Sequence, residues 1–211
     1  MRGSLNARSM PKYRLTYFDF SGSRGEECRL ALFASGVDFE DHRIDRPAWQ
    51  ALKPTTPFGS LPVLEREGHA PLAQSNAILA YVGRSYGLYP SDPWEAARHD
   101  ALLAAAEELR VLVAPTGNAP TPEAKRQARE EFARGPLQSW AERLERQLQG
   151  PFVAGESMFV TDIKIFQVMR AYYQGVIEHI SGDAFQAYPK LCALYAAVGA
   201  HPKVVEWSAR H

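Results

Sequence analysis

The hydrophobic pattern of this 211-residue chain changes once, near the prolines Pro90 and Pro93. Before them, short alternating segments rich in aromatic, Val, Ile and Thr residues predict strands, with helical segments between them. After them, Ala-, Leu- and Glu-rich segments with helical spacing continue to the end of the chain. A chain with this change of pattern folds as a small α/β layer followed by an all-helical unit. We place the two units at residues 12–90 and 91–211.

The N-terminal segment, residues 1–11, reads as an unstructured extension or a tag-like leader. The 24 Lys and Arg residues balance the 24 Asp and Glu residues, so charge favours neither a nucleic acid nor a membrane partner. No apolar stretch is long enough to span a bilayer. Two cysteines, Cys28 and Cys192, are too few for a disulfide scaffold and fit a reducing compartment. We therefore expect a cytoplasmic protein with a small molecule or another protein as its partner.

Local patterns in the first unit predict the order strand, helix, strand, hairpin, helix. "KYRLTYFD" and "VDFEDHRID" alternate as strands do, and "RGEECRLALFASG" between them is a helix that stops at Gly36. "LEREGHAPLA" reads as a hairpin across Gly68, and "SNAILAYVGRSYG" as a helix capped by Ser75.

A proline interrupts the apolar run "SLPVLE" at Pro62. Proline has no N–H for a strand ladder, so it marks an edge, a bulge or a turn. A cis bond before Pro62 is a further possibility, and it would direct the backbone of Leu61 toward something outside the sheet. That partner could be a ligand.

Four segments in this order, "YRLTYFD", "EDHRI", "AWQALKPTTPFGSLPVLE" and "LAQSNAILAYV", resemble the cytosolic glutathione transferases, most closely the sigma class. The resemblance runs from Lys12 to the C-terminus. It implies a thioredoxin-like N-terminal domain of order βαβαββα with a mixed sheet, and an all-α C-terminal domain. It also implies glutathione as co-substrate and a homodimer.

By this resemblance, the hydroxyl of Tyr17 donates a hydrogen bond to the glutathione sulfur, and Arg24 supports the thiolate with positive charge. A free thiol with a pKa of about 8.5 is mostly protonated near neutral pH, whereas the thiolate is the nucleophile. A bond that favours the thiolate by about 2–3 kcal/mol lowers that pKa by about two units. The loop "FSGSRGEE" is one residue longer than the family pattern between Phe20 and Arg24, which affects how Tyr17 is presented.

Cys28 raises a rival interpretation, because some relatives of this fold form mixed disulfides through a Cys at the start of the first helix. Here Cys28 sits about one turn into the predicted helix, on the face that carries Leu32. We favour a buried, inert thiol at this position.

The resemblance also implies how glutathione is held. The backbone of Leu61, before a cis Pro62, pairs with the cysteinyl unit as an added antiparallel strand. The start of a helix suits the γ-glutamyl carboxylate, because its free N–H groups and positive dipole end favour anions. The side chains implied are Gln74 and Ser75 for this carboxylate, and Trp49 and Lys53 for the glycyl carboxylate.

The segment "HDALLAAAEELRVL" resembles the helix whose acidic residue reaches across a dimer interface to the γ-glutamyl amino group. Glu107 and Glu108 are the candidates, and we prefer Glu108 from the partner subunit. Some sigma relatives bind a divalent metal here through an Asp cluster. Ala104 breaks that cluster, so we predict no metal.

The family's second domain usually begins a buried helix with a Ser or Thr cap three residues before an Asp. The segment "SMFVTDIKIF" keeps Asp162 but has Phe159 at the cap position, with Thr161 beside the Asp. Asp162 is expected to be structural, and the cap is left open.

We predict an enzyme that conjugates the glutathione thiolate to hydrophobic electrophiles. Two alternatives are a glutathione-dependent isomerase of the prostaglandin type and a non-catalytic relative that binds glutathione or apolar ligands. The sequence does not identify the electrophile. The residues expected to line the acceptor pocket are Phe18, Phe20, Leu109 and Val113.

Overall fold

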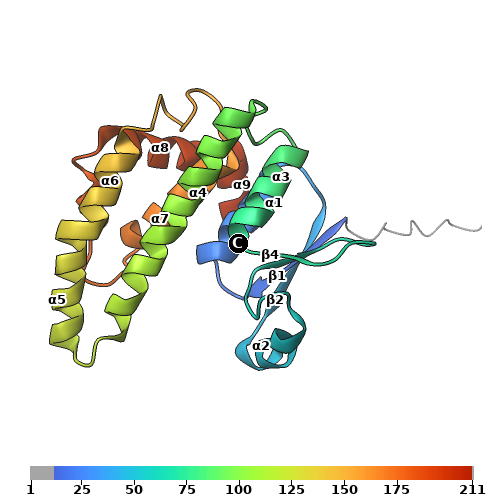
Figure 1. The fold of residues 1–211 in the computed structure, drawn as a ribbon, viewed down its shortest axis with the longest axis horizontal. Coiled ribbons are helices and arrows are strands. Elements are labelled where there is room, and N and C mark those ends of the chain that lie inside the picture. The colour runs from blue at the N-terminus through green and yellow to red at the C-terminus, as the bar shows by residue number, and fades with distance from the viewer. Residues whose placement is uncertain (1–11, 211) are drawn as a thin grey trace, which may run out of the picture.

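The structure is a computed structural model that describes residues 12–210, so the predicted N-terminal extension lies outside the described residues. A four-stranded sheet and its helices form one half of the molecule, and a group of helices forms the other (Figure 1). We call Tyr13–Ser85 the sheet half and Pro93–Ser208 the helical half. The strands are β1 Tyr13–Phe18, β2 Phe39–Ile44, β3 Val63–Glu65 and β4 Leu72–Ala73, in the spatial order β2-β1-β3-β4.

The sheet is mixed, as the resemblance implied. Strands β1 and β2 are parallel and are joined by α1 (Ser23–Ala34), since a parallel pair needs a crossover. Strand β3 is antiparallel to β1, with Thr16 opposite Val63, and β3 and β4 form the predicted hairpin. Gly68 at the hairpin turn has φ +75°, a left-handed conformation that glycine adopts without steric cost.

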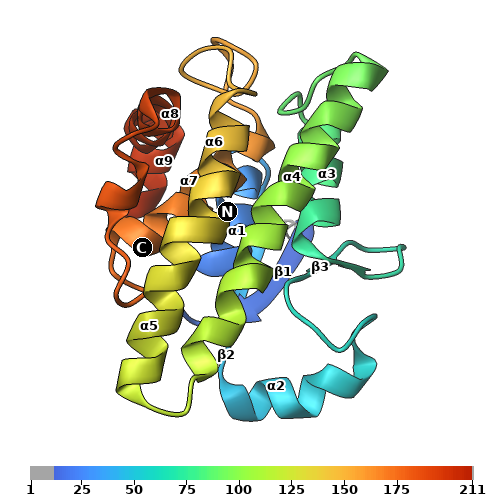
Figure 2. The ribbon, with the colours of Figure 1, turned by 60° about the vertical axis from the view of Figure 1, so that its left-hand side comes forward.

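Two further helices complete the sheet half. Helix α2 (Arg46–Leu52) and a 3₁₀ turn (Lys53–Thr55) follow β2 and lie at the lower edge of the view in Figure 2. Helix α3 (Ser75–Ser85) begins one residue earlier than predicted, because Gln74, with φ +71°, is in the capping position and Ser75, the predicted cap, is already helical.

The helical half starts at α4 (Pro93–Val113), whose first N–H groups are satisfied by Asp92. The Asp92 carboxylate accepts from the N–H groups of Trp94 and Glu95 at 3.0 and 2.9 Å. The remaining helices are α5 Pro122–Phe132, α6 Gln138–Glu145, α7 Val160–Tyr173, α8 Pro189–Ala200 and α9 Pro202–Ser208, with a π-helical segment Ala133–Leu137 between α5 and α6 and 3₁₀ turns at Ala114–Asn118 and Gly182–Phe185. No helix in the described part of the chain is long and apolar enough to cross a membrane.

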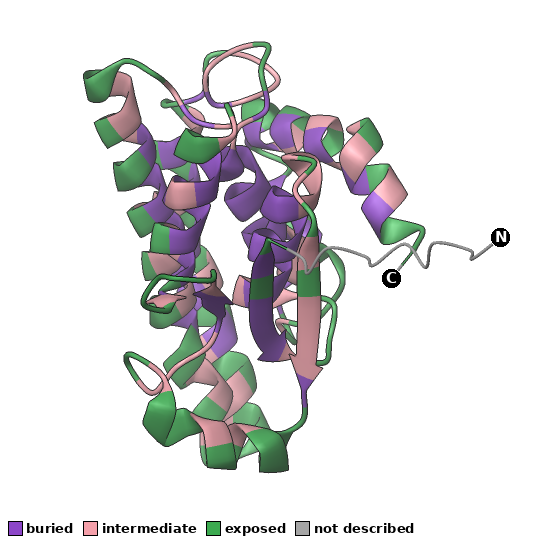
Figure 3. Ribbon diagram, turned by 90° about the vertical axis from the view of Figure 1, so that its right-hand side faces the viewer, coloured by how far each residue is buried: buried purple, intermediate pink, exposed green. Residues whose placement is uncertain are grey.

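Helix α1 is buried on nearly every side, from Gly25 to Leu32. It packs against the sheet on one side and against α7 and α9 of the helical half on the other, and Figure 3 shows the resulting band of buried residues. The indole N–H of Trp207 in α9 donates to the buried Glu26 carboxylate at 2.6 Å. The Trp207 ring also stacks on Phe39 of β2. The two halves therefore share one hydrophobic core.

The start of α7 is held by Asp162. Its carboxylate accepts from the backbone N–H groups of Val153 and Phe159, each at 2.7 Å. A Phe side chain has no acceptor, so only the Asp half of a capping box is present. Thr161 is paired instead with His99, at 2.9 Å between Oγ1 and Nδ1. Asp162 is thus structural, as expected. Its carboxylate, rather than a Ser or Thr side chain at position 159, accepts the hydrogen bond from the backbone N–H at the start of the helix.

Candidate active site

Tyr17 lies at the end of β1, and its side chain is 6% exposed. Helix α1 fixes the ring: a Cβ on Gly25 would lie 2.0 Å from Tyr17 Cδ1, so only glycine allows this approach. The buried Arg29 guanidinium lies 5.6 Å from the ring centroid. It also donates to the carbonyl oxygens of Phe18 and Phe20 at 3.0 and 2.9 Å. Helix α1 therefore positions both Tyr17 and the loop that follows it.

The electrostatic surroundings keep Tyr17 a hydrogen-bond donor. Burial raises the pKa of its hydroxyl, while the Ser23 hydroxyl and the positive charges of Arg24 and Arg110 oppose that rise. A phenol that remains protonated near neutral pH can donate to an anionic sulfur. Ser23 is held with φ +57° at the start of α1, in the loop that carries the extra residue.

Arg24 stands in the first turn of α1 and is partly exposed, with 39% of its side chain accessible. Its Nη2 and Nε lie 2.5 and 2.7 Å from Glu107 Oε1 in α4. This ion pair ties the predicted loop arginine to the helical half, and it keeps a positive charge near the Tyr17 hydroxyl.

The Leu61–Pro62 peptide bond is cis. Continuing the antiparallel register of Thr16 with Val63 puts Pro62 opposite Tyr17. Within residues 12–210, the backbone N–H and C=O of Leu61 make no hydrogen bond. These two free groups fit the addition of an extended peptide such as glutathione.

Gln74 and Ser75 lie together at the start of α3. Ser75 is 4% exposed, whereas Gln74 is exposed and has φ +71°. The first N–H groups of this 11-residue helix have no partner within the helix, and they give its N-terminus partial positive charge. This geometry fits a carboxylate.

Trp49 and Lys53 lie one turn apart, in α2 and in the 3₁₀ turn that follows it. The Trp49 ring meets the Phe18 ring edge-on, with centroids 6.1 Å apart. Lys53 is exposed. The Phe18 ring, at the end of β1, thus contacts the rings of both Trp49 and Tyr17.

A cavity of about 340 Å³ opens between the loop after β1, the end of α4, α5 and α7. Phe20 and Val113 line it. Leu109 has no exposed surface, packs in the core and is not part of the cavity wall. Of the four residues predicted for an acceptor pocket, the structure brings two together here. We call this space the acceptor cavity.

The sequence analysis missed a buried ion cluster behind the site. Lys164 of α7 is fully buried, and its Nζ lies 2.9 Å from Glu27 Oε1 and 2.7 Å from Glu107 Oε2. The same Nζ is 3.4 Å from the Ser75 hydroxyl, and Arg110 Nη1 is 2.8 Å from Glu27 Oε2. The signal that could have revealed the cluster is the single lysine in the apolar run "VTDIKIFQVM".

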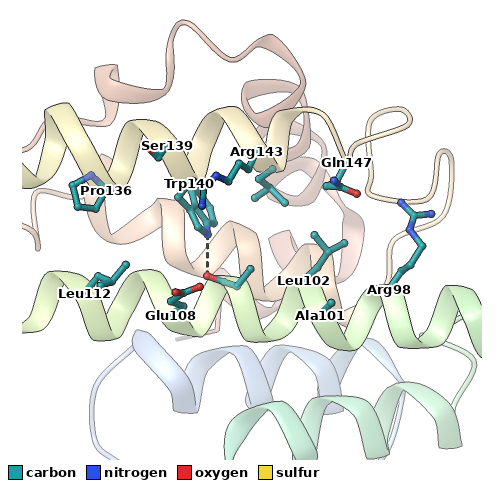
Figure 4. Close-up of a pocket in the computed structure, with 12 residues that line it drawn as sticks. Arg98, Ala101, Leu102, Glu108, Leu112, Pro136, Ser139, Trp140, Arg143 and Gln147 are labelled. Atoms are coloured by element: carbon teal, nitrogen blue, oxygen red, sulfur yellow. Dashed lines mark hydrogen bonds between the residues drawn. The ribbon is translucent and has the colours of Figure 1, made fainter.

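The two candidate acidic residues of α4 face different surroundings. Burial favours a raised pKa for Glu107, but the charges of Lys164 and Arg24 outweigh it and lower the pKa to about 2. Glu108 is exposed and lines a groove of about 450 Å³ between α4 and α6, on the side of α4 away from α1 and α3 (Figure 4). Glu107 is thus engaged within its own chain, while Glu108 faces outward.

Cys28 is fully buried, and burial raises the pKa of its thiol well above the ordinary value. It fits the favoured interpretation of an inert core thiol. Residues 12–210 contain no cluster of three or more His, Cys, Asp or Glu side chains placed to hold a metal ion.

Comparisons with known proteins agree with this geometry. Residues 13–84 match the family "Glutathione S-transferase, N-terminal domain", and residues 110–211 match "Glutathione S-transferase, C-terminal domain". The chain is 52% identical to Glutathione S-transferase 1 of Ascaris suum over 94 residues, which is 44% of this chain and 45% of that protein. It is 32% identical over 202 residues to hematopoietic prostaglandin D synthase of Gallus gallus, covering 94% of this chain and 96% of the relative.

A solved structure of prostaglandin synthase D of Nilaparvata lugens superposes with a TM-score of 0.82 at 28% identity, covering 95% of this chain and 98% of the other. The fold therefore extends along the whole described chain: a thioredoxin-like domain with a mixed four-stranded sheet, followed by a helical domain. Members of the matched family use glutathione as co-substrate. The chain belongs to the glutathione S-transferase family.

Proposed function

We propose that this protein is a sigma-type glutathione transferase that joins the glutathione sulfur to hydrophobic electrophiles. The observation that carries the proposal is the placement of Tyr17, which is buried at the end of β1, where the register of β1 with β3 continues to the cis Leu61–Pro62 bond. Residues 12–90 would bind glutathione, and the loop after β1 with the helices of residues 91–211 would hold the electrophile.

In the proposed reaction, the Tyr17 O–H donates to the glutathione thiolate and Arg24 adds positive charge nearby. The thiolate sulfur attacks the electrophilic carbon, a C–S bond forms, and the leaving group departs with its bonding electrons. Leu61 pairs with the cysteinyl backbone, Pro62 holds the bend, and the polar side chains Gln74, Ser75, Trp49 and Lys53 hold the two carboxylates.

The test is the pKa of the bound glutathione thiol, followed by ultraviolet thiolate absorbance against pH in wild type and in Tyr17→Phe. We expect a lowered thiol pKa in wild type that rises by about two units in the variant. Glutathione binding without any lowering of the pKa would contradict the assigned role of Tyr17. Absence of binding would favour the non-catalytic alternative.

A second candidate function is glutathione-dependent isomerisation. It is favoured by the relative that matches nearly the whole chain, which is named a prostaglandin D synthase. Product analysis separates the two. A glutathione adduct supports transfer, whereas unchanged glutathione beside a rearranged lipid supports isomerisation.

We also propose that the protein acts as a cytoplasmic homodimer in which Glu108 of one subunit meets the γ-glutamyl amino group in the other. The exposure of Glu108 supports this role, because Glu107 is already paired within its own chain. Sedimentation should give a species of twice 23.5 kDa. A species of 23.5 kDa alone would remove Glu108 from the site.

A further inference from the structure

The acceptor cavity carries more positive charge than an apolar electrophile requires. Four arginines line it, Arg24, Arg110, Arg129 and Arg170, and no Asp or Glu of the described residues contributes to its wall. Arg24 is ion-paired with Glu107, and Arg110 with Glu27. Neither Arg129 nor Arg170 has a carboxylate within ion-pair distance among residues 12–210. The cavity therefore holds two cations that this part of the chain leaves uncompensated.

Arg129 is the more unusual of the two, because it is 7% exposed. Its Nε and Nη1 atoms are buried without a hydrogen-bond partner in the described chain. Burial lowers the pKa of its guanidinium, and the carboxylate of Glu178 is engaged by Lys125 instead. An isolated buried charge is costly unless an opposite charge or hydrogen bonds compensate it. Arg129 is therefore a donor group without an acceptor.

A second unpaired donor faces the same space. Gln167 of α7 is 3% exposed, it lines the cavity, and its Nε2 has no hydrogen-bond partner within residues 12–210. A buried polar group without a partner usually marks a place for water, an ion or a ligand. Arg129 of α5 and Gln167 of α7 thus bring unpaired N–H groups to the wall of one cavity from two helices, and the Gln167 amide also carries an oxygen acceptor.

We propose that the acceptor substrate carries a carboxylate, bound by the Arg129 guanidinium with the Gln167 amide as a second donor. The inference rests on the proposed function, since it names the class of electrophile that the cavity takes. The planar guanidinium matches the two oxygens of a carboxylate better than a single point charge does. The electrophilic carbon then extends from the anion toward the loop that follows Tyr17.

The test compares three benzyl halides with the same reacting carbon: 4-(bromomethyl)benzoate, its methyl ester and 4-(bromomethyl)benzenesulfonate. In wild type we expect kcat/KM with the benzoate to exceed that with the ester by about tenfold or more, after correction for the uncatalysed rates. In Arg129→Met the ratio should fall toward one, and Arg129→Lys should restore part of it. The exposed Arg126→Met on the same helix is the matched control and should keep the wild-type ratio. Gln167→Leu, which leaves Arg129 in place, should also lower the ratio of kcat/KM for the benzoate to that for the ester.

Equal rates for benzoate and ester in wild type would overturn the inference while leaving the transferase proposal intact. A preference for benzoate that survives Arg129→Met, or a sulfonate preferred to the benzoate, would also overturn it. If none of the halides is conjugated, calorimetric binding of unreactive 4-methylbenzoate decides. Binding that is lost in Arg129→Met supports the anion site although the transferase proposal fails, and no binding to wild type overturns the site as well.

Discussion

At the scale of single residues, the position of the Tyr17 hydroxyl depends on the missing side chain of Gly25. We expect Gly25→Ala to displace the ring, destabilise the fold by about 1–3 kcal/mol and raise the pKa of bound glutathione toward its free value. Urea unfolding and the thiolate titration measure these effects. Gly135→Ala is the control, because a Cβ there would have no heavy atom within 4 Å. A normal titration in Gly25→Ala would show that the ring need not be held so closely.

Substitution of Lys164 should lower the free energy of unfolding more than substitution of Gly25. Removing it leaves the fully buried Glu27 without one of its two cationic partners, so we expect Lys164→Met to cost about 3–5 kcal/mol in urea unfolding. Because the cost comes from the uncompensated carboxylate, the double variant Glu27→Gln/Lys164→Met should lose less than the sum of the two single variants. Additive losses would mean that the two groups do not interact.

Glu107 should make the fold sensitive to acid. Its pKa is lowered from an ordinary 4.5 to about 2, so its ionised form is favoured by folding. The stabilisation is present above pH 4.5 and is lost as the pH falls toward 2. In Glu107→Gln, this loss should be absent from the curve of unfolding free energy against pH. A variant curve parallel to that of wild type in this window would argue against the ion pairs with Arg24 and Lys164.

At the scale of elements, the local signals in the sequence predicted the sheet half well. Alternation predicted β1 and β2, and the stop at Gly36, which has φ +72°, is a local backbone requirement. The surroundings of α1 could not be predicted in the same way. Its sequence suggests one buried face, whereas Glu26 and Glu27 are buried too, because α7 and α9 cover the other side. Those partners lie more than a hundred residues away, and no short pattern identifies them.

The same limit applies to the site. The positions near β1, β3 and the start of α3 were predicted from segments with a recognisable order. The ion cluster around Lys164 and the unpaired Arg129 were not, because lone charged residues on helices usually face solvent. Only the packing of α5 and α7 shows that these side chains are buried.

Asp162 at the start of α7 makes the stability of the fold depend on pH with a sign opposite to that of Glu107. Burial raises the pKa of Asp162 from 3.8 to about 7, although the Phe159 and Val153 N–H groups oppose the rise. Its contribution to stability is therefore complete below pH 3.8 and is lost as the pH rises through 7. Relative to Asp162→Asn, wild type should lose stability between about pH 4 and 7. Thermal unfolding followed by circular dichroism across that pH range measures this loss. A difference in stability between wild type and Asp162→Asn that stays constant with pH would contradict the raised pKa.

At the scale of the whole molecule, the shared core predicts one unfolding transition. Contacts of α1 with α7 and α9, and the Glu26–Trp207 bond, join the halves through buried surface. We expect calorimetry to give a single peak whose enthalpy equals the van't Hoff value. Labelling of the buried Cys28 thiol, in the sheet half, and circular dichroism, dominated by the helical half, should both report unfolding at the same urea concentration. Two separate transitions would show that the halves are independent.

The buried bond between Glu26 and Trp207 also bears on how the chain is made. The two residues are 181 positions apart, so α1 leaves the ribosome long before α9 exists. At a synthesis rate of about 5–20 residues per second, this delay lasts roughly 10–40 s. During that time the nascent sheet half exposes the face of α1 that α7 and α9 later cover. The first half of the polypeptide thus emerges with an open apolar surface, and its folding is completed only after α9 has been synthesised.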